Sequence, residues 1–534
     1  MNRPLKMELE YTTFDVAIIG GGIIGAGIAR DAAMRGWKVA LFEKGDFGGG
    51  TTSGSTRLIH GGLRYLEMLD FRLVRMDLRE RETLLRIAHH LIKPLQFLMP
   101  FYSRSPVFRA KMRLGMRLYD LLSYDKSLPS RCYLTREQLL TLEPHLRREG
   151  LQGASGFFDA QVNSPERLCL ENILSAREHG AATFNYCEVT GAKTDGSALQ
   201  GLLVCDLLEG DELEVKTRIV VNAAGPWVDK VGARLSDNWQ HRIRTTKGIH
   251  IACPPLCRHA LALSSPIDSR LFFVIPWLGY TWVGTTDTDF GADPGEVNAE
   301  ASDVRYLVES AAAYFPQIAR APIIFSNAGV RALVEEKGNE SSISRMHKIM
   351  DGERAGARGL ITVLGGKITG YRAIAEETTD MICRKLGNHR RCVTAATPLP
   401  GARPALPAQR RNGVAQETAD HLAKLYGSRA SQLLDLVSED RSLVEPLAPD
   451  YPDIAAQVIF AVRFEQCVRA SDFINRRTLL GFAPDQGSKA VPAVVELMGR
   501  ELSWSPSRRR DEIEECARHR SRIHQHAEEA AELR

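Results

Sequence analysis

Three glycines near the N-terminus, Gly20, Gly22 and Gly25, stand between an apolar run and a helical pattern. The run FDVAII over residues 14–19 predicts a strand, and the pattern AGIARDAAMRG that follows the glycines predicts a helix. A second apolar run, WKVALF, ends directly before Glu43. Strand, glycine turn, helix, strand and acid in this order are typical of a unit that binds a dinucleotide.

Each of these residues has its own task in such a unit. Gly20 makes the tight turn, Gly22 lets the backbone approach a pyrophosphate, and Gly25 allows the helix to pack closely on the strand. The N-terminus of the helix offers unpaired N–H groups and the positive end of its dipole to the phosphates. Glu43 is expected to accept hydrogen bonds from the ribose hydroxyl groups. The motif alone does not choose between NAD and FAD.

A loop rich in Gly, Ser and Thr follows the acid and favours a flavin nucleotide. Its hydroxyl side chains include Thr52, Ser53 and Ser55, which are expected to donate hydrogen bonds to phosphate oxygens, and Arg57 is expected to neutralise one phosphate. A nicotinamide enzyme usually continues into another α/β repeat at this point. The alternative interpretation is a flexible surface loop, since such loops often have this composition.

The segment RLIHGGLRYLE over residues 57–67 resembles the signature of the FAD-dependent, quinone-linked glycerol-3-phosphate dehydrogenases. Further segments resemble the same family in the same order: VVNAAGPWVD at 220–229, KGIH at 247–250, VIPW at 274–277, GTTD at 284–287, AGVRALV at 328–334, LGGKITGYR at 364–372 and RASDFINRRT at 469–478. The resemblance extends from about residue 14 to about residue 480. Three positions depart from the family pattern, namely Ile24, Ala332 and Gly370, and the last two leave the exact substrate open.

The resemblance implies the oxidation of sn-glycerol 3-phosphate to dihydroxyacetone phosphate, with hydride transfer to FAD and electrons passed on to membrane quinone. A dehydrogenase or an oxidase of another polyol phosphate is the alternative. The residues expected to hold the substrate are Arg64, Tyr65, Arg331, Arg345 and Lys367. His60 and His250 are candidates for the base, because histidine titrates in a suitable range, although either is equally well explained as a core residue or a flavin contact.

By the same resemblance, Arg331 is also a catalytic candidate, because it can polarise the substrate hydroxyl. Gly225, Gly365, Gly366 and Lys367 are expected to contact the cofactor, with Lys367 supplying positive charge to the reduced flavin. The sequence contains no convincing metal-ligand spacing, and we expect no metal. Histidines near the C-terminus, such as His519, are interpreted as exposed bystanders.

The expected fold class is α/β: a Rossmann-like FAD-binding domain, an antiparallel-sheet substrate domain and a C-terminal helical domain. The oxidoreductase region is placed at 14–398 and the helical domain at 399–534, joined by the Pro-rich stretch TPLPGARPALP. Within the first region, flavin parts are expected at about 14–70, 150–230 and 355–395, with cap and substrate parts at about 71–149, which reads as helical, and 231–350.

Composition limits the possible partners and the possible cellular location of the protein. The chain of 534 residues has a net charge of only +4, which argues against a nucleic-acid partner, and its ten mostly isolated cysteines predict a reducing cytoplasmic compartment. No apolar run is long enough to cross a bilayer. A non-catalytic flavin-stabilised interaction protein is disfavoured, because the matched segments retain the candidate His, Arg and Lys side chains. A homodimer is left open.

Residues 104–122 combine five basic side chains with apolar ones before the first acid, Asp120. A basic amphipathic helix of this kind can lie on an anionic membrane, which would place the protein at the inner face of the cell membrane. The alternative is a basic helix packed on the protein's own core.

Overall fold

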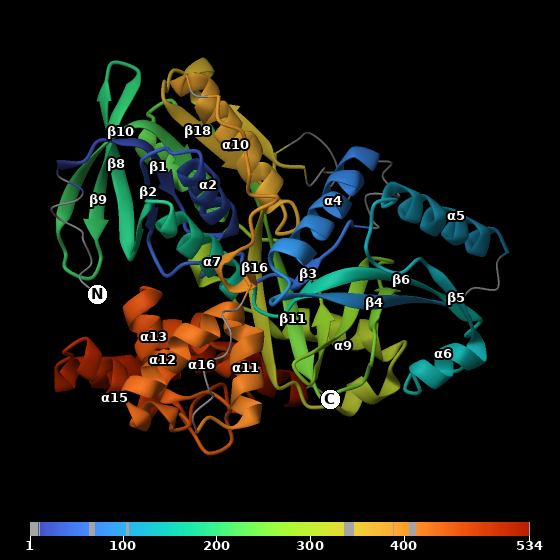
Figure 1. Ribbon diagram of the computed structural model, residues 1–534. Coiled ribbons are helices and arrows are strands. Elements are labelled where there is room, and N and C mark those ends of the chain that lie inside the picture. The colour runs from blue at the N-terminus through green and yellow to red at the C-terminus, as the bar shows by residue number, and fades with distance from the viewer. Residues whose placement is uncertain are drawn as a thin grey trace.

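The computed structural model describes residues 9, 11–62, 70–102, 106–335, 346–387, 389–404 and 413–532. Within these residues the chain forms two large sheets, each covered by helices, and a group of helices near the C-terminus (Figure 1). The predicted fold class, with a Rossmann-like domain, a second and largely antiparallel sheet and a C-terminal helical part, is therefore confirmed.

The first sheet has the order β17-β18-β10-β1-β2-β7. Its strands are β1 (Phe14–Ile19), β2 (Val39–Glu43), β7 (Ala182–Asn185), β10 (Glu212–Asn222), β17 (Lys348–Asp351) and β18 (Leu360–Leu364), and the hairpin strands β8 (Cys187–Asp195) and β9 (Ala198–Asp206) extend it from β10. The central strands run parallel, so their carboxyl ends meet at one edge. The predicted strand–helix–strand unit over 14–43 is confirmed.

The helix α2 (Ile23–Met34) is apolar on nearly all sides because helices cover it. It packs between α7 (Pro165–Glu178) and α10 (Tyr371–Leu386) on one face of the first sheet (Figure 1). Its small residues, among them Ala26 and Ala29, are fully buried. Full burial fixes the position of the first turn of α2, and the site described below depends on that turn.

The second sheet has the order β15-β11-β14-β13-β12-β4-β6-β3, with β16 beside β11 and β5 beside β6. Its strands are β3 (Leu58–Ile59), β4 (Ile92–Phe101), β5 (Cys132–Thr135), β6 (Gly153–Val162), β11 (Ile243–Cys253), β12 (Ala260–Ser264), β13 (Leu271–Trp277), β14 (Tyr280–Gly284), β15 (Thr288–Asp289) and β16 (Phe325–Val334). The helices α6 (Arg136–Leu142) and α9 (Ala301–Ala312) pack on one face, while α4 (Phe71–Ile87) and α5 (Pro106–Leu122) pack on the other.

The interpretation of residues 71–149 as helical is wrong in part. The strand β4 lies in this stretch and pairs along its whole length with β6, a strand from the segment expected to serve the flavin part. The short strand β3 joins the same sheet. Sequence analysis did not predict β4, because the charged helical pattern before residue 92 was extended over it. The strand character of β4 depends on a partner about sixty residues away in sequence. The second sheet therefore draws on both sets of segments.

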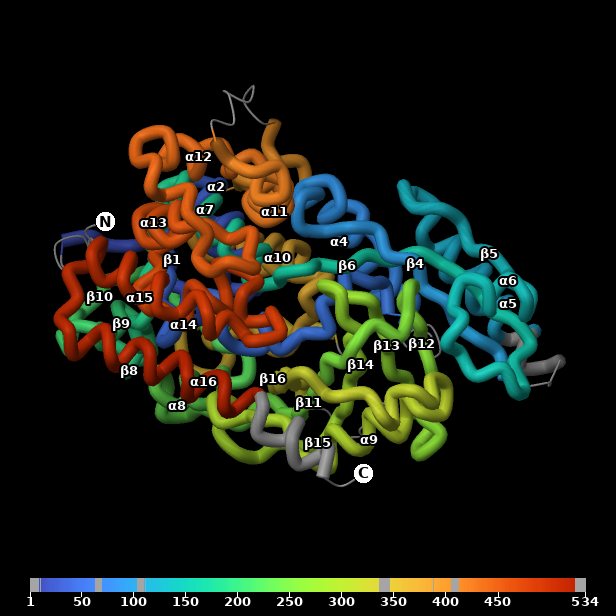
Figure 2. The backbone as a smooth tube through the Cα atoms, turned by 90° about the horizontal axis from the view of Figure 1, so that it is seen from below, coloured from blue at the N-terminus to red at the C-terminus, as the bar shows by residue number. Residues whose placement is uncertain are grey.

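The named elements after residue 413 are helices: α11 (Gln416–Tyr426), α12 (Ala430–Glu439), α13 (Ala455–Phe464), α14 (Ala470–Asp472), α15 (Val491–Glu501) and α16 (Pro506–Glu532). Two apolar clusters form their core. Figure 2 shows α16 extending from α15 toward β16 and α9, and the Ser326 hydroxyl donates a hydrogen bond to the carbonyl of Ile523 at 3.1 Å. The Thr183 hydroxyl of β7 donates to Gln466 at 2.9 Å, so this helical region contacts both sheets.

Candidate active site

A cavity of about 800 Å³ lies between the carboxyl edge of the first sheet, the second sheet and the C-terminal helices. This volume is typical of a site for a cofactor or another small molecule. One end is lined by the turn after β1 and by Glu43, and the other by His60, His250 and Arg331. The cavity therefore joins the expected nucleotide residues to the expected catalytic ones.

The three glycines of the first turn are required for three different reasons. Gly20 has φ +109°, and a Cβ on it would lie 2.6 Å from the carbonyl oxygen of Ala223. A Cβ on Gly25 would lie 1.9 Å from the carbonyl oxygen of Gly20, so only glycine lets the helix and the turn approach so closely. A Cβ on Gly22 would meet only the Thr52 hydroxyl, at 3.5 Å, and would project into space that the cavity offers to a ligand.

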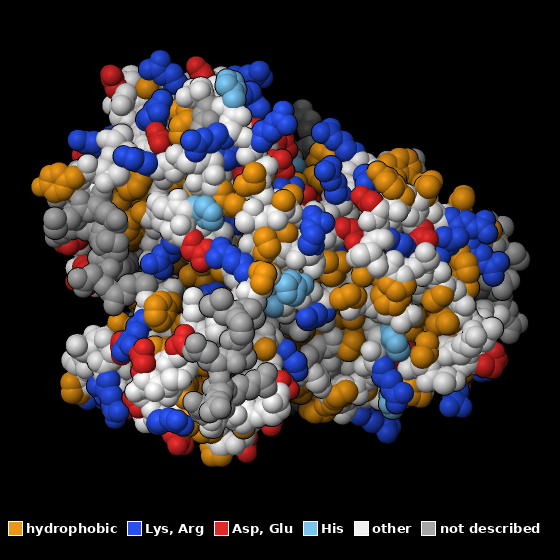
Figure 3. Space-filling view, viewed as in Figure 1, with side chains coloured by type: hydrophobic (Ala, Val, Ile, Leu, Met, Phe, Trp, Pro, Cys, Tyr) orange, Lys and Arg blue, Asp and Glu red, His pale blue; other side chains and the backbone are white. Residues whose placement is uncertain are grey.

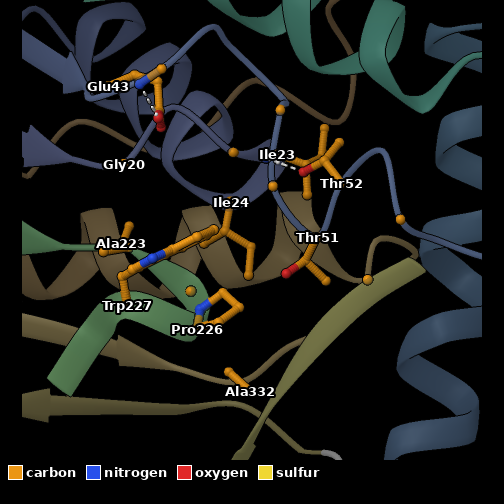
Figure 4. A pocket seen from close by; sticks show the side chains of 18 of the residues that line it. Gly20, Ile23, Ile24, Glu43, Thr51, Thr52, Ala223, Pro226, Trp227 and Ala332 are labelled. Carbon is orange, nitrogen blue, oxygen red and sulfur yellow. Dashed lines mark hydrogen bonds between the residues drawn. The ribbon is translucent and has the colours of Figure 1, made fainter. Parts of the chain in front are cut away.

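The first turn of α2 receives its capping group from the Gly/Ser/Thr loop. The backbone N–H of Ile23 donates to Oγ1 of Thr52 at 3.1 Å, as the dashed line in Figure 4 shows. No acidic side chain occupies this turn. Because Thr52 accepts here, its own hydroxyl proton can be donated to an acceptor in the cavity. The arrangement suits an anion at the helix N-terminus.

Glu43 ends β2 and is held in place by backbone groups (Figure 4). Its carboxylate accepts from the N–H of Gly21 at 2.7 Å and from the N–H of Gly45 at 2.8 Å. Burial raises the pKa of Glu43, and these two N–H groups oppose that shift. Each oxygen of the carboxylate still has acceptor capacity toward the cavity, as recognition of ribose hydroxyls requires.

The residues of the loop after Glu43 that were expected to contact phosphate do not all face the cavity. Ser55 lines the cavity, whereas the Ser53 hydroxyl donates back to the carbonyls of Gly49 and Gly50 and does not line it. The expectation for Arg57 is wrong: its guanidinium is fully buried and pairs with Glu166 at 2.9 Å. The positive charge of Arg57 is therefore paired with a buried carboxylate of α7 and is not available to a phosphate.

His250 lies on β11 and is almost completely buried. Its ring stacks on Trp282 with centroids 5.1 Å apart, and its Nε2 lies 3.0 Å from the Thr56 hydroxyl. Its Nδ1 is buried without a hydrogen-bond partner in the part of the chain that the structure describes. Burial lowers the pKa of His250 well below the ordinary value, and Arg331 and Arg57 lower it further. The imidazole is therefore neutral at physiological pH.

His60 lines the same cavity but is only half-buried. It follows β3, and its backbone N–H donates to the Thr369 hydroxyl at 3.1 Å, which ties it to the turn before α10. Its ring meets Phe273 edge-on with centroids 5.9 Å apart. Both candidate bases therefore face the cavity, but in different surroundings.

Arg331, on β16, lies flat over the backbone of β11. A Cβ on Gly248 would lie 2.1 Å from its Nη2, so this glycine, two residues after the register partner Thr246 on β11, makes room for the guanidinium itself. The guanidinium donates to Asp287 at 3.1 Å and to the Thr285 hydroxyl at 2.7 Å. The structure thus positions a cation in the wall of the cavity, and Asp287 is shared with Arg270 at 3.0 Å.

Lys367 belongs to the turn between β18 and α10, where Gly365 and Gly366 have φ of +65° and +105°. Its ammonium group forms an ion pair with Asp77 of α4. Asp77 is fully buried, and burial raises its pKa to about 6 although Lys367 opposes the shift. Gly225, the last expected cofactor glycine, has φ +54° and lines the cavity beside Pro226 and Trp227 (Figure 4).

Two family models match this chain. The model described as "FAD dependent oxidoreductase" matches residues 15–381, and the model for the C-terminal domain of alpha-glycerophosphate oxidase matches residues 392–509. A glycerol-3-phosphate dehydrogenase of Synechocystis is 38% identical over 98% of each chain. The chain belongs to the FAD-dependent glycerol-3-phosphate dehydrogenase family. The family resemblance inferred from the sequence motifs is thereby confirmed.

Two further relatives agree with this assignment. An aerobic glycerol-3-phosphate dehydrogenase of Staphylococcus haemolyticus is 33% identical, over 95% of this chain and 94% of the relative. The crystal structure of a glycerol-3-phosphate dehydrogenase from Bacillus halodurans, complexed with FAD, is similar with a TM-score of 0.77 and 29% identity, and the match covers 97% of this chain and 96% of that one. The likeness therefore spans both sheets and the helical region.

Some sequence-predicted residues lie outside the described part of the chain: Arg64, Tyr65 and Arg345. Conversely, sequence analysis missed cavity residues that come from other segments, namely Tyr186, Arg469, Ser471, Asn475, Arg476, Glu515 and His519. The interpretation of His519 as an exposed bystander is wrong, because burial lowers its pKa to about 4 and it lines the cavity. The motif RASDFINRRT was a signal for four of these positions, at 469, 471, 475 and 476, but nothing local connected it to the site.

A search of the described residues for metal ligands finds no group of three or more His, Cys, Asp or Glu side chains arranged to hold an ion. Cys253 and Cys257 are buried in the second sheet's core, where the Cys253 thiol donates to the carbonyl of Thr281 at 3.6 Å. In the described part of the chain, no helix is both long and apolar enough to cross a membrane.

Proposed function

We propose that this protein binds one FAD and oxidises sn-glycerol 3-phosphate to dihydroxyacetone phosphate. The observation that carries the proposal is the single cavity that connects the glycine turn and Glu43 to Arg331, His250 and Lys367. Membership of the family supplies the substrate class, since the full-length relatives are named as glycerol-3-phosphate dehydrogenases. Ala332 lines the cavity where the family has Pro, which keeps another polyol phosphate as the alternative substrate.

The residues at the first sheet's edge fit an FAD. The open space at Gly22 and the first turn of α2 suit the pyrophosphate, Glu43 suits the ribose, and Thr52 and Ser55 supply hydroxyl donors. The positive-φ turn at Gly365 and Gly366 brings backbone and Lys367 to the other end of the cavity. When bound, FAD supplies the hydride-accepting chemistry, and the protein supplies binding and orientation.

The positive groups at the catalytic end are suited to a phosphate ester. Arg331 presents a planar donor set that suits a phosphate, and it is oriented by Asp287 and Thr285. Lys367 adds a second cation, fixed by Asp77. With Arg64, Tyr65 and Arg345 as further expected contacts, these side chains orient the carbon that loses hydride.

The two histidines have different surroundings, and we propose a different role for each. A base gains positive charge when it accepts the hydroxyl proton, and burial together with Arg331 and Arg57 disfavours that charge on His250. His60 is half-buried and can pass a proton on to solvent. We therefore assign proton acceptance to His60, and assign to His250 a neutral hydrogen bond that orients the hydroxyl. His60→Asn should lower kcat at saturating substrate more than His250→Asn does.

Membrane quinone is the proposed electron acceptor, and α5 is the proposed docking element at the inner face of the membrane. On α5, Met116 and Tyr119 are buried against the second sheet, so the helix does pack on the core. Its opposite side exposes Arg113 and Arg117, together with Leu114 and Leu121, each of which is 67% exposed. Basic and apolar side chains gather over this helix in Figure 3. One face of the helix therefore serves packing, and we assign the exposed face to docking.

An anaerobic substrate screen tests the function. The purified protein should be yellow, and sn-glycerol 3-phosphate should bleach the oxidised flavin band while glycerol without phosphate should not. A colourless protein that binds only NAD would contradict the FAD assignment. Bleaching by a longer polyol phosphate alone would favour the alternative substrate, and reoxidation by oxygen as fast as by quinone would favour an oxidase.

A further inference from the structure

The segment Arg469–Thr478, which carries the motif RASDFINRRT, lies at the nucleotide end of the cavity although it belongs to the helical region. Arg469, Ser471, Asn475 and Arg476 all line the same cavity as Glu43. The proposed function uses none of these side chains. The contacts of the charged residues of the motif nevertheless connect it to the nucleotide end of the cavity.

The link to the nucleotide end runs through Tyr186. Its neighbour Asn185 is the register partner of Glu43 in the first sheet, and the N–H of Tyr186 donates to the carbonyl of Gly45 at 2.9 Å. Tyr186 therefore stands directly beside the acid that suits the ribose. The guanidinium of Arg469 lies over the Tyr186 ring, 4.9 Å from its centroid.

Arg469 has donor capacity to spare at this place. Its Nε is buried and has no hydrogen-bond partner among the residues that the structure describes. Below it, the Tyr186 hydroxyl donates to Asp472 at 2.6 Å, which fixes the ring that Arg469 covers. Because Arg469 lines the cavity, the rest of its guanidinium can donate to an anionic ligand there.

A second link joins the same segment to the loop that follows Glu43. Asp46 accepts from both Nη atoms of Arg477, at 2.7 and 2.8 Å, and from Nε of Arg476 at 2.7 Å. Asn185 also donates to it at 3.0 Å. Burial alone would raise the pKa of Asp46, but Arg477 and Arg476 hold it well below its usual range. The docked segment therefore supplies the positive charge that compensates the buried carboxylate of Asp46.

We propose that the segment Arg469–Arg477 is a latch on the cofactor: Arg469 closes the nucleotide end of the cavity over the adenosine diphosphate part of FAD, and the Asp46 ion pairs tie that closure to the docking of the helical region. The inference rests on the proposed FAD binding. Removing one partner of a buried ion pair is strongly destabilising, so the helices and the loop move as a unit. Any free energy that FAD gains from Arg469 stabilises the docked helices by the same amount.

The test is the rate at which the holoenzyme releases FAD, followed by the fluorescence of free FAD after dilution. Arg469→Ala should release FAD at least tenfold faster than the parent, and Arg469→Lys should recover part of the difference. Arg463→Ala is the matched control, because Arg463 lies in the same helical region but pairs with Glu501 on the surface, and its release rate should not change. Release from Arg469→Ala at the parent rate would overturn the contact.

The coupling is tested separately with Asp46→Asn, again as holoenzyme. Its amide hydrogen exchange over 416–501 and its FAD release should both become faster. Faster release with unchanged exchange in the helices would overturn the latch as a coupled unit. If Asp46→Asn does not fold, the exchange of 416–501 in the Arg469→Ala holoenzyme decides the coupling instead. A parent protein without any FAD would overturn the proposed function and the latch together.

Discussion

At the scale of single residues, the side chains that face the cavity are oriented by partners that lie behind them. Asp77 lies behind Lys367, and Asp287 and Thr285 orient Arg331. None of these partners needs to touch substrate. Each one sets the direction and charge state of a group that does, and this makes the following two predictions specific.

Arg331→Ala should lower kcat/KM for sn-glycerol 3-phosphate by about 30- to 150-fold, because losing a charge-assisted hydrogen bond costs about 2–3 kcal/mol. FAD content should stay at the parent level, and Asp287 keeps its pair with Arg270. Arg244→Ala is the control, because Arg244 pairs with Asp289 at the surface of the same sheet. A variant as active as the parent would exclude Arg331 from phosphate binding.

The pKa of about 6 at Asp77 predicts an acid limb in the pH profile of kcat/KM. As the pH falls below about 6, Asp77 takes up a proton and Lys367 loses its anion, so the activity should decline. Glu80 and Asp159 also face Asp77 and raise its pKa. Asp77→Asn should remove this limb and leave a lower, flatter profile between pH 5 and 8.

The control for this profile is Asp125→Asn, which removes the surface partner of Arg75 on the same helix, α4. Its profile should match the parent's. An acid limb near pH 6 that persists unchanged in Asp77→Asn would assign the titration to another group.

At the scale of elements, the turn between β1 and α2 and the helix α5 show how one segment serves both packing and binding. In the turn, Gly25 is needed for packing and Gly22 for access. In α5, one side packs on the second sheet and the other faces solvent. Variants can therefore separate the two functions within each element.

Gly22→Val should give a folded protein that binds no FAD. The added Cβ meets only Thr52, at 3.5 Å, but occupies the space proposed for the pyrophosphate. Gly25→Val should instead fail to fold, because its Cβ would overlap the carbonyl of Gly20 at 1.9 Å. Circular dichroism and bound flavin measure the two outcomes. A yellow Gly22→Val protein would show that the pyrophosphate lies elsewhere.

Charge reversal on α5 at Arg109, Lys111 and Arg113 should release the protein from anionic vesicles. Each cation near such a surface contributes about 1 kcal/mol, so losing three weakens binding by roughly 100-fold. Dye-linked activity in solution should not change, and binding by the parent should fall as salt rises. Glutamate at the exposed Arg305, Arg320 and Arg354 is the control. If both triple variants bound anionic vesicles equally well, α5 would have only a structural role.

At the scale of the whole molecule, local patterns predicted the parts and long-range contacts decided how they meet. The glycine turn, its helix and Glu43 lie within thirty residues, so spacing alone located them. Tyr186 and Asp472 are 286 residues apart and Asp46 and Arg477 are 431 apart, and no local pattern connects such pairs. The strand β4 was missed for the same reason, since β6 gives it its place.

A buried histidine between the sheets and the helical region predicts acid lability. His90 packs against Gly401 and Gly427, and burial lowers its pKa to about 3. Because the unfolded chain binds a proton here near pH 6.5, stability is lost as the pH falls from 6.5 toward 3, at up to about 1.4 kcal/mol per pH unit. His90→Gln should therefore show a smaller fall in melting temperature between pH 7 and pH 4.5.

For comparison, His145→Gln removes an exposed histidine and should keep the parent's pH dependence. His250 and His519, whose pKa values burial also lowers, act in the same direction and limit how much one variant recovers. An identical fall in melting temperature for His90→Gln and the parent would exclude His90.

The ion pair between Asp46 and Arg477 also sets an order of events during synthesis. At roughly 5–20 residues per second, the ribosome makes Arg477 about 20–90 s after Asp46. Until then Asp46 has neither arginine partner and remains hydrated, so the carboxyl edge of the first sheet stays open in the nascent chain. We expect the cofactor to enter through this edge while it is open, and translation of the last helices to close it.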